Sequence, residues 1–240
     1  MKHLPFFFML ISSATVLAQS SFQPLTRTVD LSVAGKSDFA TLALTINQLH
    51  GIGRSNRFRL GYGLRLTSAF SGPLNYITAP ARLTSGTESI VALFTENILT
   101  NLDTLRLNRT RATSLNASIH IEYALTKRFE AGINIDAIGV TFGGSQSGVF
   151  YANAPDRSSL TGTVQSAHVT RFNVLLISDS DRGSLNSEAY VRYRFTPKVS
   201  LRGGIGFQFN EYTTDRKLTF ENDRFRSKNA MPMLALAYHF

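Results

Sequence analysis

The chain has 240 residues, of which 43% are hydrophobic and 17% are charged, and its formal net charge at pH 7 is +9. This apolar content is sufficient for a packed structure and excludes a disordered chain. The sequence contains no cysteine, which excludes a disulfide scaffold, a cysteine metal site, a thiol nucleophile and a lipoprotein anchor.

The first eighteen residues have the three regions of a secretory signal peptide. A basic start at residues 1–3 precedes an apolar run at residues 4–11, and the small residue Ala18 stands before Gln19. The alternative is a buried N-terminal strand or helix. We predict removal of residues 1–18 and Sec-dependent export of a single domain at residues 19–240. No later segment has about 18 consecutive apolar residues, so we expect no membrane-spanning helix.

Hydrophobic and polar residues alternate along most of the remaining chain. Leu115, Ile119 and Ile121, for example, share one face of an extended segment, whereas Asn116 and His120 share the other. Alternation with a period of two predicts β-strands that have one apolar and one polar face. We predict an all-β, antiparallel barrel of eight strands, at residues 24–33, 38–48, 57–69, 113–125, 129–142, 185–195, 199–211 and 228–240.

The connections between these strands differ in length. Residues 126–128 and 196–198 are tight turns, whereas residues 70–112 and 143–184 are long connections. The predicted strands are mostly longer than the usual 5–6 residues or so, and about 9–11 residues cross a membrane. Long connections at one end of a barrel and short ones at the other are typical of outer-membrane proteins. Apolar stretches at residues 90–94 and 172–177 would add a strand pair, so ten strands are the alternative.

Aromatic residues gather on the apolar faces near the tight turns, as in the belt that marks a membrane interface. A soluble β-sandwich or lipocalin-like barrel also alternates, so a soluble periplasmic binding protein is a further alternative. The predicted belt consists of Phe58, Tyr123, Phe129, Tyr193, Phe195, Tyr238 and Phe240. A weaker set toward the other end consists of Phe70, Phe142, Phe209 and Tyr212.

The strand pattern and the C-terminal segment 233–240 resemble the small eight-stranded outer-membrane β-barrel proteins of diderm (Gram-negative) bacteria. In that segment Leu236, Tyr238 and Phe240 resemble the signal that such proteins present to the barrel-assembly machinery. The resemblance implies insertion from the periplasm, termini on the periplasmic side and long loops outside the cell. It implies no single activity, because the family includes structural barrels, adhesion and resistance proteins, secretion accessories and a few lipid-modifying enzymes.

The polar strand faces point into the predicted barrel, where side chains fill a lumen of this size. We interpret this interior as a polar plug held by ion pairs between arginines and carboxylates, with an ion pathway as the alternative. Glycines at 61, 63, 132, 204 and 206 leave room for the long guanidinium groups. The predicted lumen residues are Arg57, Arg59, Arg65, His120, Glu122, Glu130, Asp136, Glu188, Arg192, Arg194 and Arg202, with Asp30 on the same side.

Three neighbouring lumen positions, Ser118, His120 and Glu122, invite comparison with a hydrolase such as the lipid A deacylases among small barrels. Residues two apart on a strand are roughly 7 Å apart, so we expect direct hydrogen bonding along the strand to be strained. A hydrogen-bonded filler of the lumen is the preferred interpretation, and we predict no catalytic residue.

We also predict no metal ion and no cofactor. Asp179 and Asp181, followed by Asn186 and Glu188, loosely suggest a calcium loop, but the spacing is incomplete and solvated loop charges are the simpler interpretation. The histidines at 50, 168 and 239 are isolated from one another, without metal-ligand spacing.

The positive charge is dispersed over strands and loops rather than clustered with aromatic residues, so we expect no nucleic-acid partner. Loop cations facing anionic lipopolysaccharide are a better explanation. The expected partners are outer-membrane lipid, lipopolysaccharide and the barrel-assembly machinery. We expect the protein to be a monomer with a structural, adhesion-like or assembly-accessory role. A narrow channel and a lipid-modifying enzyme are the alternatives. The cations nearest the long connections are Arg106, Arg109, Arg111, Arg216, Lys217, Arg224, Arg226 and Lys228.

Overall fold

The computed structural model describes residues 22–86, 98–154, 158–176 and 180–240. These residues form a single antiparallel sheet of 13 strands. The predicted signal peptide at residues 1–18 and the apolar stretch at residues 90–94 lie outside the described residues. Within the described part of the chain, no helix is long and apolar enough to cross a membrane, a finding that does not bear on a β-barrel.

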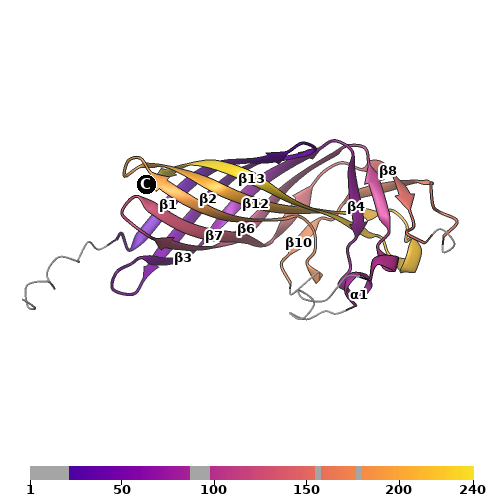
Figure 1. Ribbon diagram of the computed structural model, residues 1–240, viewed down its shortest axis with the longest axis horizontal. Coiled ribbons are helices and arrows are strands. Elements are labelled where there is room, and N and C mark those ends of the chain that lie inside the picture. Colours follow the sequence, from indigo (N-terminus) through magenta and orange to yellow (C-terminus); the bar gives the residue numbers. More distant parts are fainter. Residues whose placement is uncertain (1–21, 87–97, 155–157, 177–179) are drawn as a thin grey trace, which may run out of the picture.

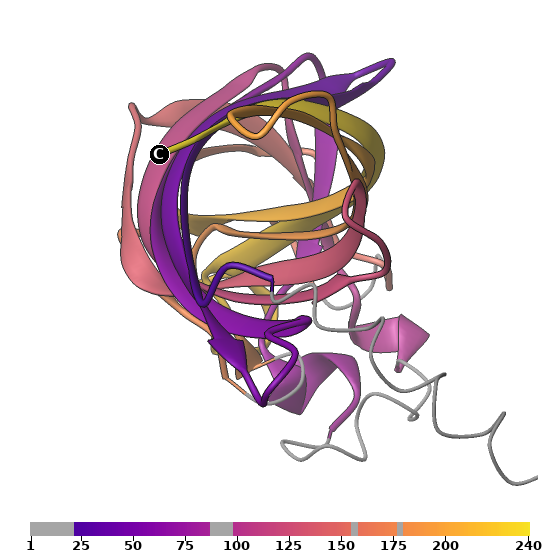
Figure 2. The ribbon, with the colours of Figure 1, turned by 90° about the vertical axis from the view of Figure 1, so that its left-hand side faces the viewer.

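Eight long strands pair in a closed circuit, and Figure 2 shows this ring from the end that carries the C-terminus. Closure leaves no unpaired strand edge along the barrel wall. The eight strands, each paired with the next and the last paired with the first, are β1 (Leu25–Lys36), β2 (Phe39–Ile52), β3 (Phe58–Ser71), β6 (Thr110–Ala124), β7 (Phe129–Phe142), β11 (Leu185–Arg194), β12 (Val199–Thr214) and β13 (Arg224–His239).

The remaining strands lie at the opposite end of the barrel from the C-terminus (Figure 1). They are β4 (Leu74–Thr78), β5 (Thr104–Leu107), β8 (Gln146–Tyr151), β9 (Val164–Val169) and β10 (Phe172–Val174), with the short helices α1 (Ala81–Thr84), η2 (Leu99–Asn101) and η5 (Thr219–Glu221).

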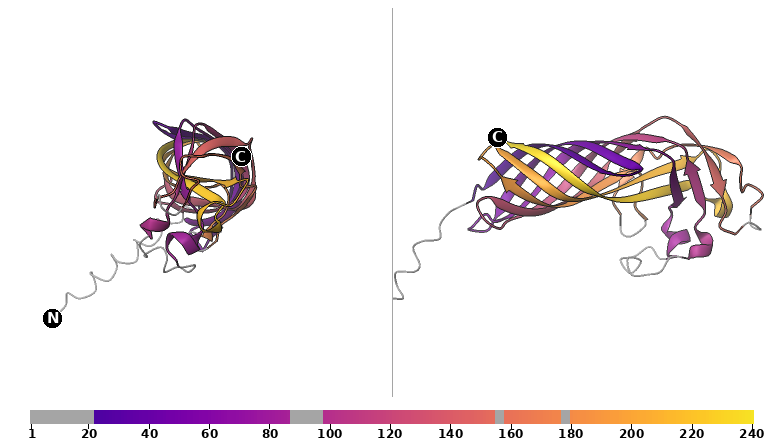
Figure 3. Two further views of the ribbon diagram at one scale, coloured as in Figure 1. Left: turned by 90° about the vertical axis from the view of Figure 1, so that its right-hand side faces the viewer. Right: turned by 45° about the horizontal axis from the view of Figure 1, so that its top comes forward.

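Four of these short strands build a second closed circuit on the ends of β12 and β13. β13 pairs with β4, and the pairing continues through β5, β8 and β9 to β12. β12 and β13, with 16 residues each, are long enough to belong to both circuits. We call this second unit, made of β4, β5, β8, β9 and the far ends of β12 and β13, the cap (Figure 3).

The sheet therefore has more strands than the eight predicted, and also more than the alternative of ten. All eight predicted segments fall on strands of the barrel circuit. The strands that the prediction missed lie in the two long connections, which were expected to be loops. They have only three to six residues each, too few for a clear alternation of apolar and polar positions.

The outer face of the barrel is apolar. Leu64, Ile133 and Leu234 are each more than half exposed on it. Water-soluble proteins rarely expose contiguous apolar surface of this kind, and a closed barrel pairs its backbone polar groups internally, as a bilayer requires. At the turn end, exposed aromatic side chains form the predicted belt: Phe58, Tyr123, Phe129, Phe195, Tyr238 and Phe240. Tyr193 lies among them, with its ring centroid 5.0 Å from Phe129 and 5.1 Å from Phe195.

The weaker aromatic set at the other end is only partly on the outer face. Phe70 and Phe142 are exposed there, but Phe209 and Tyr212 are buried. The prediction was wrong for these two residues because β12 continues into the cap, where both of its faces are covered.

A charge on the outer face should destabilise the barrel only where that face contacts lipid. Leu64 and Val164 are similarly exposed, at 59% and 68%, but Leu64 lies in the middle of a barrel strand and Val164 lies in the cap. We expect Leu64→Arg to lower the free energy of unfolding by about 2–4 kcal/mol and Val164→Arg to change it by less than about 0.5 kcal/mol. Urea unfolding in phospholipid vesicles measures both, and equal tolerance would contradict a lipid-facing surface.

Candidate functional site

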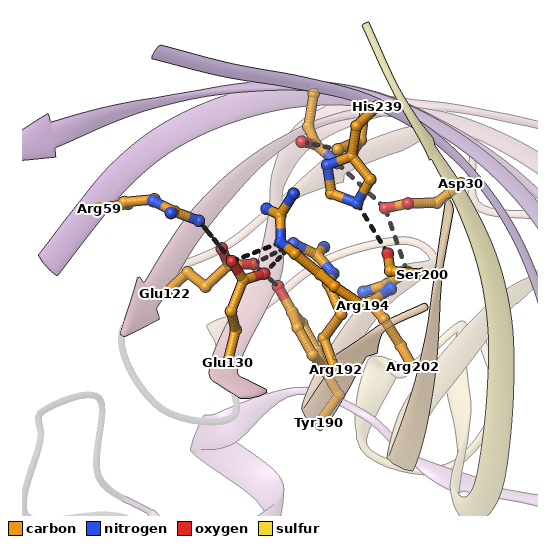
Figure 4. A network of polar contacts seen from close by, with 12 residues as sticks. Asp30, Arg59, Glu122, Glu130, Tyr190, Arg192, Arg194, Ser200, Arg202 and His239 are labelled. Atoms are coloured by element: carbon orange, nitrogen blue, oxygen red, sulfur yellow. Dashed lines mark hydrogen bonds and ion pairs between the residues drawn. The ribbon is translucent and has the colours of Figure 1, made fainter. Parts of the chain in front are cut away.

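Ten charged side chains fill the barrel lumen as five arginines and five carboxylates, in two clusters, and Figure 4 shows the whole of the first cluster together with Asp30 and Arg202 of the second. The first, which we call the mouth cluster, lies toward the tight turns and consists of Arg59, Arg192, Arg194, Glu122 and Glu130. Arg59 Nη1 lies 2.8 Å from a carboxylate oxygen of each acid. Arg192 Nη1 also contacts both acids, at 2.5 and 3.1 Å, and Arg194 Nε lies 2.8 Å from Glu130. With three cations and two anions, the mouth cluster has a net charge of +1.

The second cluster lies deeper in the lumen and has the opposite balance. This central cluster consists of Arg65, Arg202, Asp30, Asp136 and Glu188. Glu188 joins its two arginines, at 3.5 Å from Arg65 and 3.1 Å from Arg202. Arg65 also lies 3.2 Å from Asp136, and Arg202 lies 3.4 Å from Asp30. Two cations against three anions give the central cluster a net charge of −1.

The side chain of Tyr190 separates the two clusters. Its hydroxyl donates a hydrogen bond of 3.3 Å to Glu122, and the guanidinium of Arg202 lies over its ring at 4.4 Å from the centroid. A Cβ atom at Gly132 would come within 2.6 Å of this ring. The glycine at 132, predicted to leave room for an arginine, therefore makes room for Tyr190.

Ser118 and His120 form a direct hydrogen bond in the lumen, with 2.8 Å between Oγ and Nε2. Glu122 does not extend this bond into a triad, because its carboxylate pairs with Arg59 and Arg192 instead. Ser118 and His120 are buried, at 2% and 1% exposure. His239, which seemed isolated in the sequence, is bonded in a similar way to Ser200, with 2.7 Å between Nε2 and Oγ.

Asn173 closes the lumen on the side of the cap, where β10 pairs with residues 138–140 of β7. Its Oδ1 accepts hydrogen bonds from the Thr141 hydroxyl at 2.8 Å and from the Ser184 backbone at 2.9 Å. Its Nδ2 donates to Asn116 Oδ1 at 2.7 Å. The sequence indicated a possible strand at residues 172–177, but it offered no signal for the role of Asn173 itself.

An apolar core inside the cap follows Asn173 along the barrel axis. Within it the Tyr76 hydroxyl donates to Thr110 at 3.0 Å, and burial raises the pKa of Tyr76 to about 12, so this hydroxyl stays protonated at neutral pH. On the side of the cap, the lumen therefore ends at the hydrogen bonds of Asn173, and the apolar core of the cap lies beyond them. The core residues with at most 1% exposure are Tyr76, Leu105, Leu107, Phe150, Ala167, Tyr212 and Phe225.

Arg57 is the one predicted lumen residue that the structure places elsewhere. It precedes the first residue of β3, its side chain is exposed, and its guanidinium lies 5.5 Å from the ring centroid of Phe22. The alternation assigned it inward, but the strand ends before this position and the turn carries it into solvent. The structure places inside the lumen Arg59, Arg65, His120, Glu122, Glu130, Asp136, Glu188, Arg192, Arg194 and Arg202.

The sequence suggested that Arg224 and Arg226 lie in an open loop, but the structure places both in β13. Both bind the carboxylate of Glu211, at 2.8 and 2.9 Å, and both donate to the backbone carbonyl of Asp181. Arg226 is only 2% exposed. The prediction ended one strand at residue 211 and began the next at residue 228, so it missed the register that pairs Glu211 with Arg226.

The proposed calcium loop is not assembled from the residues that suggested it. Asn186 and Glu188 lie in the lumen wall, whereas Asp179 lies outside the described residues. Among the residues that the structure describes, no group of three or more histidines and acids is placed to hold a metal ion.

No protein-family model matches the chain, and no curated protein sequence matches it. Solved structures do resemble it. Neisserial surface protein A is 11% identical and aligns over 91% of this chain and 98% of its own, with a TM-score of 0.40. A major outer membrane protein from Thermus thermophilus is 12% identical over 91% of this chain and 100% of its own, with a TM-score of 0.36.

The Yersinia pestis outer membrane protein Ail is 11% identical over 90% of this chain and 99% of its own, with a TM-score of 0.35. Likenesses this distant say nothing about the activity or ligands of this chain. Its own surface locates it: the closed antiparallel barrel has an apolar exterior, an aromatic belt and a polar lumen, which is the construction of an outer-membrane β-barrel.

The mouth cluster should be necessary for the stability of the barrel. Arg192→Met removes the guanidinium that contacts both Glu122 and Glu130. Removing one partner of a buried ion pair leaves uncompensated charge and costs about 3–5 kcal/mol, so we expect a loss of that size in urea unfolding. Lys198→Met removes the same charge from an exposed turn and should change the free energy of unfolding by less than about 0.5 kcal/mol. Equal stability of the two variants would show that the cluster does not hold the barrel.

Proposed function

We propose that this protein is a closed, non-enzymatic outer-membrane barrel that presents its cap at the cell surface for adhesion-like recognition. The observation that carries this proposal is the double closure of the lumen by the ion-pair clusters and by the apolar core of the cap. A lumen filled with paired charges supports the plug interpretation over the channel. The burial of Ser118 and His120 behind this network argues against the lipid-modifying enzyme.

The loop between β12 and β13 supports a recognition role for the cap. Phe220 and Glu221 are consecutive non-glycine residues with positive φ, at 57° and 54°. Left-handed backbone of this kind costs about 1–3 kcal/mol per residue, persists only where surrounding structure enforces it and clusters at functional sites. Phe220 is 39% exposed, and its carbonyl accepts a hydrogen bond from Arg82.

Exposed cations on and near the cap support lipopolysaccharide as the lipid partner. Anionic surfaces attract dispersed positive charge of this kind. At the other end of β13, Leu236, Tyr238 and Phe240 are exposed on the outer face, which supports recognition of this strand by the barrel-assembly machinery. We propose insertion as a monomer, because one chain closes the barrel by itself. The exposed cations on and near the cap include Arg106, Arg109, Arg111, Arg216, Lys217 and Lys228.

The orientation of the barrel can be tested with single cysteines, because the chain has none of its own. Val164 is exposed on the cap, and Lys198 lies in the turn between β11 and β12 at the opposite end. We expect a membrane-impermeant maleimide to label Val164→Cys on intact cells and Lys198→Cys only after permeabilisation. The reverse labelling would place the cap in the periplasm and overturn the proposed recognition role.

A closed lumen should not conduct ions. We expect the wild-type protein, inserted in a planar bilayer and shown to be folded by its gel shift on heating, to give no regular conductance steps. Steps that change in size in Arg202→Gln would instead show that ions pass the central cluster. That result would favour the narrow channel over the plug.

A further inference from the structure

A cavity of about 870 Å³ opens at the mouth of the barrel, between the tight turns and the ends of β1 and β13. It adjoins the mouth cluster, since Arg59, Arg194 and Glu130 belong to both. The lining cations outside the mouth cluster are exposed, and exposed charges contribute little to folding. The cations that line this cavity are Arg27, Arg59, Lys127, Arg128, Arg194 and Lys198.

The charge around this cavity is strongly unbalanced. Six cations line it against the single carboxylate of Glu130. The remaining two members of the mouth cluster, Arg192 and Glu122, have opposite charges and leave this imbalance unchanged. A concave site with one sign of charge and low-dielectric walls concentrates ions of the opposite sign.

Two side chains in the cavity wall are buried and fixed in position. Arg59 Nε and His239 Nδ1 have no partner among the described residues, although the two side chains are only 3% and 6% exposed. The same side chains are fixed by their other atoms, Arg59 by Glu122 and Glu130 and His239 by Ser200 (Figure 4).

We propose that the mouth cavity is a binding site for a phosphate group. Arginine offers a planar fork of donors and lysine a compact charge, and the two together are the usual protein ligands of phosphate. Arg194 keeps its side chain 17% exposed, with its Nε already directed at Glu130, so its fork is held at the edge of the cavity. Lys127 and Lys198, in the two tight turns, add mobile charges at the rim.

The phosphate can come from two sources that share this chemistry. One is a soluble phosphate or pyrophosphate, and the other is the headgroup of an anionic phospholipid at the nearby membrane surface. The aromatic side chains of Phe195 and Phe240 line the same opening and belong to the exposed belt. They would contact the apolar part of a lipid, whereas a free phosphate would leave them without a role. The site does not depend on what the cap recognises.

The test is titration calorimetry of the whole protein in a neutral detergent at low ionic strength, with pyrophosphate as the probe. We expect saturable binding by the wild-type protein. Lys198→Gln should weaken it about threefold, and Lys127→Gln combined with Lys198→Gln about tenfold, since each exposed charge contributes modestly and distant contributions add. Arg54→Gln is the matched control, because it removes one charge from the β2–β3 turn at the same end without lining the cavity.

The gel shift on heating shows that each variant is folded, and none of these lysines belongs to the ion-pair clusters. No saturable binding, or equal weakening by Arg54→Gln and Lys198→Gln, would overturn the proposal in favour of diffuse surface charge. A second titration, in phosphatidylcholine nanodiscs with and without phosphatidylglycerol, distinguishes the sources. Loss of pyrophosphate affinity with phosphatidylglycerol identifies the lipid headgroup as the occupant, and unchanged affinity identifies the soluble anion.

Discussion

Compensation of charge inside a narrow lumen is the constraint on which the barrel depends. An arginine or a carboxylate taken out of water costs several kcal/mol or more unless a partner and further hydrogen bonds replace its hydration. Here the partners come from different strands: Arg59 of β3 reaches Glu130 of β7, and Arg202 of β12 reaches Asp30 of β1. Because a shift of one residue would turn each side chain to the lipid face, these ion pairs also specify the register of the strands.

The lumen is neutral as a whole but not in its parts. Arg57 lies outside it, which leaves five arginines and five carboxylates, divided by Tyr190 into a mouth cluster of +1 and a central cluster of −1. The net positive charge of the mouth cluster therefore lies where the lumen meets the aqueous cavity. The net negative charge of the central cluster lies deeper, where only protein surrounds it. The cavity can accept an anion without disturbing the balance deeper in the barrel.

The sequence predicted the barrel circuit well and the cap not at all, for a physical reason. In a strand with one face in lipid and one in a polar lumen, alternation is strong, so it located all eight barrel strands and the inward charges. It failed at Arg57, where the strand had already ended, and at β4, β5, β8 and β9, which are short. Thr141 and Asn116, which hydrogen-bond to Asn173, are 32 and 57 residues away from it in sequence. No local sequence pattern predicts contacts of this kind.

The two longest strands show where the membrane ends, because the polarity of their faces inverts along their length. In the barrel, β12 turns Leu201 and Ile205 outward and Arg202 into the lumen. Beyond Phe209 the same outward face carries Glu211, paired with Arg226 of β13, and the inward face carries Tyr212, packed in the apolar core of the cap. The outward face is therefore apolar where it contacts lipid and carries a buried ion pair where the cap covers it, whereas the inward face is polar in the lumen and apolar in the cap. The inversion joins a membrane barrel to a water-exposed cap through two continuous strands, with no hinge or linker between them.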